Sequence, residues 1–479
     1  MREGQHVHFI GIGGIGMSGI ARVLLEMGWK VSGSDLKSSP ITSGLEEMGA
    51  RIHLGHRAEN LGEAGVIVLS SAIPQDNPER LEANHRGLKI IQRCEMLAFL
   101  MRQKFGIAVA GTHGKTTTTS MVAKVMESAE LRPTVIIGGE VNDMGSNAKL
   151  GGGFHLVAEA DESDASFVHL EPKIAIVTNM DADVNLSAEP FQDLGYDTDK
   201  TMIRVKEMFE IFANKLPEDG CLILCWDHER VRELATKVKR PILSYGFHPE
   251  AELTIKNLEL DGLKCRGDVF FKGEKLGPLV LNTPGRHNVA NALASIAVGL
   301  ELKIPASDIL SSLAHYEGVR RRFQILGEAN GVMVVDDYAH NPQKISAALH
   351  AAKTAVEKNE GRVVAVFQPH RYTRTKFLYD DFCKCFGEAD ILLVTDVYSA
   401  GEEPIADLRM EDLIQEVSKN SPNVEICRTP QERDVMDKLR GVCRSGDLVI
   451  TLGAGDVGKW GQHFLSQSQN EQVTAKATI

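Results

Sequence analysis

Short apolar runs alternate along the chain with longer amphipathic stretches and polar loops. Runs of this length, bounded by glycine or polar residues, are typical of strands buried in a parallel sheet, and apolar residues at helical spacing are typical of covering helices. The runs lie at residues 6–10, 29–35, 65–72, 106–110, 173–179, 221–226, 241–245, 332–335, 363–367, 391–395 and 447–452. Strands that alternate with helices predict an α/β protein.

The order of these runs predicts three domains within the 479 residues. Residues 1–104 and 319–479 each have the pattern of a Rossmann-like, doubly wound unit, in which polar motifs follow the strands. Residues 105–318 predict a central domain of the P-loop ATPase type, with a mixed sheet. The antiparallel part of that sheet is expected from three runs, at 253–260, 267–272 and 279–282.

The clearest chemical signal is a glycine-rich turn between the run 106–110 and an amphipathic helix that starts at Lys115. Backbone N–H groups of such a turn and the helix N-terminus bind phosphate oxygens, the lysine reaches the outer phosphates, and the next hydroxyl, on Thr116, binds Mg²⁺. The turn is a short form of the usual motif. Predicted ATP-binding residues here are Gly111, Thr112, His113, Gly114, Lys115, Thr116 and Thr117. The alternative is an ordinary strand–turn–helix with a lysine at its mouth by chance.

A second glycine motif, Gly11-x-Gly13-x-x-Gly16, follows the first run, and the next run ends in Asp35. This is a dinucleotide-binding pattern, which fits NAD, FAD or any nucleotide diphosphate. The run at 65–72 ends in hydroxyl side chains, including Ser70, at the edge where ligands bind in open α/β sheets. The motif alone therefore leaves a dinucleotide site open.

Acidic side chains crowd the end of the predicted strand that begins near residue 154: Glu159, Asp161, Glu162 and Asp164. Alternation along a strand would place Glu159 and Asp161 on one face. Acids at the end of a buried strand need compensating charge, which Mg²⁺ bound to ATP supplies. A solvated acidic loop is the alternative.

Composition narrows the classes of function. The net charge of −12 argues against a nucleic-acid-binding protein. No apolar run reaches transmembrane length and no charged-then-apolar leader opens the chain, so a cytoplasmic protein is expected. The eight cysteines lack zinc spacing and predict reduced thiols. After Trp460 the chain is rich in Ser and Gln and is expected to be poorly ordered.

These motifs, taken in order, resemble those of the Mur ligase family. The resemblance rests on residues 11–21, 32–35, 70–79, 111–117, 159–164, 284–294, 318–327, 336–342, 368–375 and 453–458, and covers nearly the whole chain. It implies ATP-dependent ligation of L-alanine to the carboxylate of UDP-N-acetylmuramate through an acyl phosphate, in peptidoglycan precursor synthesis. It also implies ATP and Mg²⁺ as cofactors, small-molecule substrates, no membrane or nucleic-acid partner, and a monomer or weak homodimer.

The resemblance also implies roles for individual residues. The UDP-substrate diphosphate would contact Gly13, Gly14, Ile15 and Gly16, and the nucleoside would lie near Asp35 and Ser70. Mg²⁺ would be held by Thr116 and Glu159; adenine and the nucleotide would be approached by Asn288, Asn291 and Arg321. Around the amino acid and the acyl phosphate would lie Asp337, Tyr338, His340, His370, Arg371 and Arg374. The residues expected to be catalytic are Lys115, Glu159, His340, Arg371 and Arg374. Helix capping is the alternative role for Asn288.

One position departs from the family pattern. Val184 stands where family members usually carry a histidine associated with a second metal. Either Asp181 or Asp183 replaces that ligand, or water and substrate hold the ion, or the protein is a weakened UDP-sugar-binding relative. A related ligase that adds another amino acid or a peptide also fits the motifs, and the first glycine motif keeps an NAD-dependent oxidoreductase open.

Overall fold

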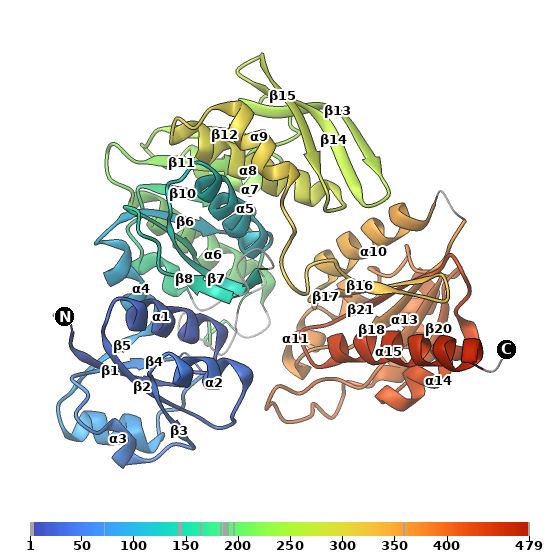
Figure 1. Ribbon diagram of the computed structural model, residues 1–479, viewed down its shortest axis with the longest axis horizontal. Coiled ribbons are helices and arrows are strands. Elements are labelled where there is room, and N and C mark those ends of the chain that lie inside the picture. The colour runs from blue at the N-terminus through green and yellow to red at the C-terminus, as the bar shows by residue number, and fades with distance from the viewer. Residues whose placement is uncertain are drawn as a thin grey trace. The chain divides into compact units, whose positions relative to one another are not determined.

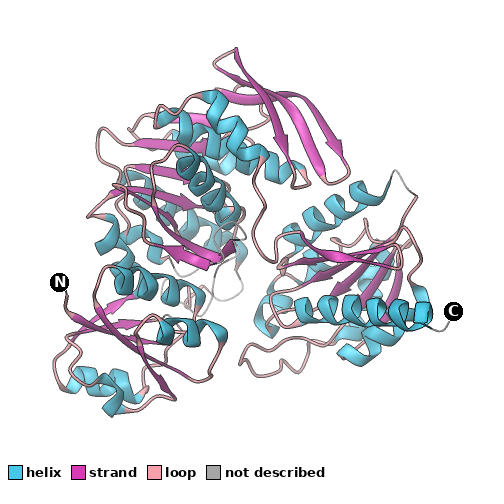
Figure 2. Ribbon diagram, in the orientation of Figure 1, coloured by secondary structure: helices cyan, strands magenta, loops and turns pink. Residues whose placement is uncertain are grey.

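The computed structural model describes residues 4–70, 72–141, 146–162, 165–182, 184, 191–194, 197–357 and 360–477. Its strands form three sheets with helices packed against them, which confirms the predicted α/β class (Figures 1 and 2). By compactness the chain divides into two units. The first comprises residues 1–256, 268–279 and 290–316, and the second comprises 257–267, 280–289 and 317–479. The domain boundaries after residues 104 and 318 stay a prediction.

The first sheet has the order β3-β2-β1-β4-β5, and all its neighbours are parallel. Its strands are β1 (His6–Ile10), β2 (Lys30–Asp35), β3 (Arg51–Leu54), β4 (Val66–Leu69) and β5 (Lys89–Gln92), and its helices are α1 (Ile15–Glu26), α2 (Pro40–Glu47), η1 (Ala58–Leu61), α3 (Pro78–His85) and α4 (Arg93–Met101). Alternate residues of β1 and β4 pack on opposite faces, one covered by α1 and α4 and the other by η1 and α3. The strand order reverses between β1 and β4, which is where such sheets bind ligands.

A buried carboxylate ties the elements of this first sheet together. Glu79, at the start of α3, is fully buried and accepts hydrogen bonds from Ser34 Oγ (2.6 Å) and Asn60 Nδ2 (2.5 Å). His8 Nε2 and His56 Nδ1 lie 3.6 and 3.5 Å from its Oε2. Burial alone would raise the pKa of Glu79, but the interactions with His8, Ser34 and Asn60 outweigh it and lower the pKa to about 2. Glu79 is therefore ionised at neutral pH.

The second sheet has the order β15-β14-β13-β12-β11-β10-β6-β9-β7-β8. Its strands are β6 (Phe105–Ala110), β7 (Thr134–Val141), β8 (Ser146–Lys149), β9 (His155–Glu159), β10 (Ile174–Val177), β11 (Cys221–Cys225), β12 (Ile242–Tyr245), β13 (Leu253–Asp261), β14 (Lys264–Phe271) and β15 (Glu274–Leu281). Its helices are α5 (Lys115–Ser128), η2 (Ser166–His169), α6 (Thr198–Asn214), α7 (Glu229–Ala235), α8 (Arg286–Glu301) and α9 (Ala306–Ala314). β6 pairs in parallel with β9 and β10, whereas β7 and β8 are antiparallel, so the sheet is mixed as predicted. This antiparallel pair lies outside the three runs from which the antiparallel part was expected.

The third sheet has the order β16-β17-β21-β18-β19-β20 and lies in the second unit. Its strands are β16 (Gln324–Ala329), β17 (Val332–Asp337), β18 (Val363–Phe367), β19 (Ile391–Val394), β20 (Glu425–Arg428) and β21 (Leu448–Leu452), and its helices are α10 (Pro342–Glu357), α11 (Tyr372–Phe377), α12 (Tyr379–Phe382), α13 (Met410–Asn420), α14 (Glu432–Val442) and α15 (Val457–Ala477). One face packs against α10 and α13 and the other against α14 and α15, which is the predicted doubly wound arrangement.

The expectation of poor order after Trp460 is wrong for the residues that directly follow it, because they continue α15. Trp460, Phe464 and Leu465 are buried and pack against the third sheet, so apolar residues at helical spacing hold a helix despite its Ser- and Gln-rich composition. All eight cysteines are free, as predicted. No helix in the described ranges combines the length and apolarity that a membrane crossing requires.

Candidate active site

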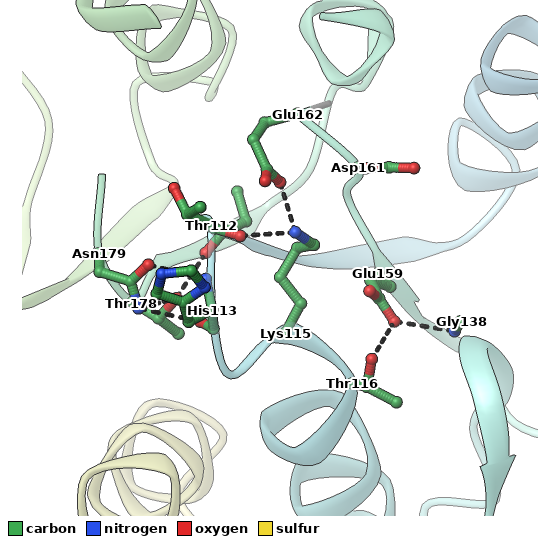
Figure 3. Close-up of polar contacts among 12 residues, drawn as sticks. Thr112, His113, Lys115, Thr116, Gly138, Glu159, Asp161, Glu162, Thr178 and Asn179 are labelled. Carbon is green, nitrogen blue, oxygen red and sulfur yellow. Dashed lines mark hydrogen bonds and ion pairs between the residues drawn. The ribbon is translucent and has the colours of Figure 1, made fainter. Parts of the chain in front are cut away.

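The phosphate-loop motif forms the turn that the sequence predicts. β6 ends at Ala110, Gly111–Gly114 turn, and α5 begins at Lys115, with Gly114 in the left-handed conformation (φ +81°). The end of β10 holds the turn in place: His113 N donates to Asn179 Oδ1 (2.7 Å), and Thr178 Oγ1 donates to the His113 carbonyl (2.6 Å; Figure 3). The loop is therefore fixed by side chains that its own motif does not contain.

Gly111 has no room for a side chain. Its φ is +130°, and a Cβ would collide with Thr178 Oγ1 and lie 3.0 Å from the backbone of Asn179. We expect Gly111→Ala to open the loop, since strain of this kind costs about 1–3 kcal/mol. The KM for ATP should rise by roughly 10- to 100-fold. Steady-state phosphate release against ATP concentration measures it. Gly441→Ala, where a Cβ meets nothing within 4 Å, is the control; an unchanged KM in Gly111→Ala would contradict the prediction.

Lys115 is held inside the loop. Its Nζ donates to the Gly111 carbonyl (2.7 Å) and to Glu162 Oε2 (2.5 Å; Figure 3). Burial alone would lower the pKa of Lys115, but the charges of Glu162, Asp161 and Glu159 raise it. Burial raises the pKa of Glu162 to about 7, with Lys115 opposing that rise. Lys115 is thus a fixed cation. Its partner Glu162 is easily protonated near neutral pH.

Thr116 and Glu159 form the pair that the sequence assigns to Mg²⁺. Thr116 Oγ1 lies 3.0 Å from Glu159 Oε2, which also accepts from Gly138 N (2.8 Å). Adjacent ligands of an octahedral ion at 2.0–2.1 Å lie about 2.9 Å apart, so this oxygen pair fits Mg²⁺. Within the described residues no three His, Cys, Asp or Glu side chains gather as a metal centre. Phosphates and water would complete the shell, as is usual for Mg²⁺.

The expectation that Glu159 and Asp161 share one strand face is wrong. β9 ends at Glu159, so the alternation of a strand does not extend to Asp161. Glu159 contacts the phosphate loop, whereas Asp161 Oδ2 lies 3.3 Å from Arg93 Nη2, on α4. Asp164 lies outside the described residues.

Val184, the residue that departs from the family pattern, lies among apolar side chains. Val184 is half-buried and packs against the main core of the first unit. Of the two aspartates considered as replacement ligands, Asp183 lies outside the described residues. Asp181 Oδ1 accepts from Arg230 (2.8 Å), and its Oδ2 lies 3.6 Å from His113 Nε2. Asp181 therefore lies beside the phosphate loop.

The two predicted adenine-site asparagines lie at the start of α8. Asn291 Oδ1 accepts from Thr118 Oγ1 (3.1 Å), and a Cβ on Gly114 would lie 2.6 Å from that same oxygen. Asn291 is thus next to the phosphate loop. Asn288 Nδ2 donates to the Pro284 carbonyl (2.7 Å), which differs from an N-cap, where a side-chain oxygen accepts from backbone N–H groups of the first turn.

The N-terminal motif lies at the reversal point of the first sheet. Gly11–Gly14 join β1 to α1, which begins at Ile15, and Gly13 N donates to Asp35 Oδ2 (2.9 Å) at the end of β2. Ser70 follows β4, on the other side of that point. Asp35 therefore supports the glycine turn as well as lying where the motif puts a ribose.

The polar motifs of the second unit converge at the carboxyl edge of its sheet. His370 stacks on Tyr398 (ring centroids 5.6 Å apart), lies 6.1 Å from His340, and accepts from Arg374 at 3.3 Å. Arg371, with a positive φ of +69°, directly precedes α11, and its Nε lies 4.0 Å from Glu402 Oε1. Burial, with the charges of Arg374, Arg371 and Arg321, lowers the pKa of His370 to about 4, so its imidazole is neutral at pH 7.

Other predicted residues of this edge make internal contacts. Tyr338 lies 5.0 Å from the Arg321 guanidinium, ring centroid to Cζ. Asp337 accepts from the backbone N–H groups of Phe323 and Ala339, both at 2.7 Å, and burial raises its pKa to about 6. Arg321 pairs with Asp336 (2.9 Å) and donates to carbonyls of the turn after β21. Arg321 thus ties the turn that contains Gly453 and Gly455 to Asp336 on β17.

Sequence reasoning missed several residues of these clusters: Thr178, Asn179, Arg93 and Tyr398. Thr178 and Asn179 directly follow a buried strand, which is a signal for an edge position. Arg93 carried no motif and no such signal.

Comparison with known proteins places the chain in a family. Residues 6–105 match the model "Mur ligase family, catalytic domain", 109–299 match "Mur ligase middle domain", and 321–455 match "Mur ligase, glutamate ligase domain". The chain belongs to the Mur ligase family. The resemblance that the motifs indicated is thereby confirmed, and so is the fold that it implied.

This Mur ligase is similar along its whole length to curated relatives. It is 48% identical to a UDP-N-acetylmuramate–L-alanine ligase of Trichlorobacter lovleyi, over 97% of this chain and 99% of the relative. It is 44% identical to the ligase of that name from Pelotomaculum thermopropionicum, over 98% and 99%. The crystal structure of a UDP-N-acetylmuramate–alanine ligase from Thermotoga maritima aligns with a TM-score of 0.79 at 27% identity, covering 97% of this chain and 99% of that one.

Proposed function

We propose that this Mur ligase joins L-alanine to the carboxylate of UDP-N-acetylmuramate, with hydrolysis of ATP to ADP and phosphate. The observation that carries the proposal is the full-length identity of 48% to a relative of that name. The intact phosphate loop, with Lys115 and the Thr116–Glu159 pair, supports ATP as the phosphoryl donor.

The proposed roles follow the three predicted domains. Residues 1–104 would hold UDP-N-acetylmuramate at the glycine turn, residues 105–318 would hold ATP and Mg²⁺, and residues 319–479 would hold the amino acid. The reversal of strand order at β1/β4 supports the first role, and the convergence of His and Arg at the edge of the third sheet supports the last. A cytoplasmic monomer or weak homodimer is part of the proposal.

The chemistry follows from the weakness of a carboxylate as an electrophile. An oxygen of the substrate carboxylate would attack the terminal phosphorus of ATP, and the bond to ADP would break. The alanine amine would then attack the acyl carbon, phosphate would leave, and the amine would lose a proton. Lys115 would neutralise charge on the transferring phosphoryl group, because a preorganised cation stabilises charge that develops in the transition state. Bound Mg²⁺, held by Thr116 and Glu159, would supply further charge neutralisation on the phosphates.

The second unit offers donors suited to the amino acid. Arg371 and Arg374 present planar guanidinium groups, which bind carboxylates by paired hydrogen bonds. The imidazole of His370 is neutral and accepts a hydrogen bond from Arg374, so it helps to orient that guanidinium without adding charge. The ring of His340 lies 6.1 Å from that of His370 and 5.2 Å from that of Tyr338, and these side chains would shape the pocket around a small side chain.

A three-substrate assay tests the proposal. We expect phosphate release only when ATP, UDP-N-acetylmuramate and L-alanine are all present with Mg²⁺, and a product whose mass has gained one alanine residue. Glycine, L-serine, D-glutamate and an L-Ala-D-Glu dipeptide serve as the comparison panel. Equal or faster turnover with another member of the panel would favour a ligase of different specificity.

The same assay distinguishes an active ligase from a protein that only binds the nucleotide sugar. Turnover at background with every acceptor, together with tight binding of UDP-N-acetylmuramate, would favour a weakened UDP-sugar-binding relative. Val184, packed against the core, is the observation that motivates this second candidate.

A further inference from the structure

Arg93 lies against the glycine turn of the N-terminal motif. It is the first residue of α4, and a Cβ on Gly16 would lie 2.7 Å from its Nη1 and 3.1 Å from its Cδ. A side chain at position 16 would therefore displace the guanidinium from the place it occupies here. In dinucleotide-binding motifs the third glycine usually serves close packing between helix and strand, so an adjacent guanidinium is an additional feature of this chain.

The other end of Arg93 reaches the acidic run of the phosphate-loop site. Its Nη2 lies 3.3 Å from Asp161 Oδ2, and the two side chains are 22% and 37% exposed. Asp161 lies between Glu159, which contacts Thr116, and Glu162, which contacts Lys115 (Figure 3). Arg93 thus stands between the two anion-binding turns of the first unit.

Neighbouring contacts fix this arrangement within the unit. Asn147 Nδ2, on β8, donates to the Ile15 carbonyl (2.6 Å) and to Ser18 Oγ (3.2 Å), at the start of α1. Leu150 N donates to Glu26 Oε2 (2.6 Å), at the end of the same helix. Both ends of α1 are therefore held to the second sheet, so the place of Arg93 beside Gly16 is built into the packing.

The N-terminus of α1 and the Arg93 guanidinium place two sources of positive charge beside Gly16, and these favour a bound anion there. α1 begins at Ile15, has no acidic residue in its first turn, and presents the positive end of its dipole there. A guanidinium at the same place adds positive charge, which disfavours the helix start unless an anion lies close by. Asp35 accepts from Gly13 N at the same turn, and Asp161 pairs with the arginine from the opposite side. A phosphate or carboxylate beside the turn would contact both the helix end and the arginine.

From this placement we infer that Arg93 binds an anionic oxygen of the nucleotide sugar, either of its diphosphate or of its carboxylate, and that Asp161 is the counterion which that oxygen replaces. The inference rests on the proposed function for the identity of the ligand. It assigns Arg93 as a substrate-binding residue and makes the Asp161 carboxylate a competitor of the substrate.

Binding measured without ATP tests the assignment in the full chain. Isothermal titration of UDP-N-acetylmuramate into Arg93→Ala should show a Kd raised by at least about 10-fold, the usual result of removing a partly buried charged partner. Arg93→Lys keeps the charge but loses the fork and should lie between the two. Asp161→Asn should bind as tightly as the unmodified chain or up to about fivefold more tightly, since a competing ion pair is removed. Arg102→Ala is the matched control: it lies at the end of α4 and pairs with Glu171 at 3.6 Å.

The outcomes separate the inference from the proposed function. Unmodified protein that does not bind the nucleotide sugar would refute the proposed function itself. If it binds, an unchanged Kd in both Arg93 variants would overturn the role of Arg93. Equal weakening by Arg93→Ala and Asp161→Asn would identify a structural bridge and would overturn it as well.

Titration with UDP alone shows whether Arg93 contacts an oxygen of the diphosphate or of the carboxylate. If Arg93→Ala weakens the binding of UDP and of UDP-N-acetylmuramate by the same factor, the contact is to the diphosphate. A loss confined to UDP-N-acetylmuramate places it on the carboxylate. Each result supports the inference and names the group, and a loss for neither refutes it.

Discussion

Replacing Lys115 with alanine should abolish ATP-dependent phosphate release. The ammonium group is held by the Gly111 carbonyl and by Glu162, and its raised pKa keeps it charged at any pH used for assay. Loss of one preorganised group that stabilises transition-state charge typically costs about 10²–10³-fold in kcat. We expect at least that loss, measured as phosphate release at saturating substrates, because Lys115 is the cation that the loop itself provides.

Two further variants show whether the charge or the packing of Lys115 matters. Glu162→Gln removes the charged partner but leaves Lys115 bound to the Gly111 carbonyl, so activity should fall by less than about 10-fold. Lys173→Ala breaks a lysine–carboxylate pair with Asp219 (2.5 Å) at the start of β10, away from the loop, and should leave kcat unchanged. Near-normal release in Lys115→Ala would remove the central assignment. Equal loss in Lys115→Ala and Glu162→Gln would reduce Lys115 to a structural partner.

The fold was predictable because its strands are buried on both faces. β6 and β18 are continuous apolar runs bounded by polar turns, and such runs leave few alternatives to a parallel sheet. The glycine turns before α1 and α5 were predictable for a related reason, since their function needs a fixed local geometry. The C-terminal helix was mispredicted because composition was weighed above the spacing of Trp460 and Phe464.

The candidate site was predictable only where its residues are close in sequence. Lys115 and Thr116 belong to one turn, but the groups that hold that turn come from far along the chain: Asn179 is 66 residues from His113, and Glu162 is 47 residues from Lys115. Arg93 and Asp161 are 68 residues apart. Such pairs depend on which strands become neighbours, and the strand order of a doubly wound sheet is not encoded in any local pattern.

Glu79→Ala should destabilise the first sheet more than any surface change in the same region. The substitution leaves the buried donors of Ser34 and Asn60 without their acceptor, and leaves His8 beside an apolar methyl group. Removing one partner from a buried charged network costs about 3–5 kcal/mol. Thermal unfolding should therefore occur at a temperature lower by about 10 °C or more. Glu82→Gln, on the same helix but exposed and paired with Arg86, is the control and should change little.

The position of the three tryptophans allows unfolding of this sheet to be followed separately. Trp29 is buried among the residues of α1 and β2, whereas Trp226 and Trp460 lie in the parts of the chain that carry the second and third sheets. With Trp226 and Trp460 replaced by phenylalanine, fluorescence reports on the first sheet alone. A transition at the same temperature with and without the Glu79 carboxylate would show that the network contributes nothing to stability.

The pH dependence of that transition tests the charge of Glu79 independently of its shape. The pKa of Glu79 is about 2 in the folded chain against 4.5 for an ordinary glutamate, so its contribution is complete well above pH 4.5 and is lost as the pH falls toward 2. By pH 4 the loss should be about 1 kcal/mol relative to pH 7. Glu79→Gln keeps the volume and one acceptor but cannot ionise, so its free energy of unfolding should fall less over the same interval. Parallel curves for the two proteins between pH 7 and pH 4 would mean that the pKa of Glu79 is not lowered in the folded state. The stabilising element would then be the hydrogen-bond geometry around Ser34 and Asn60, which glutamine preserves in part.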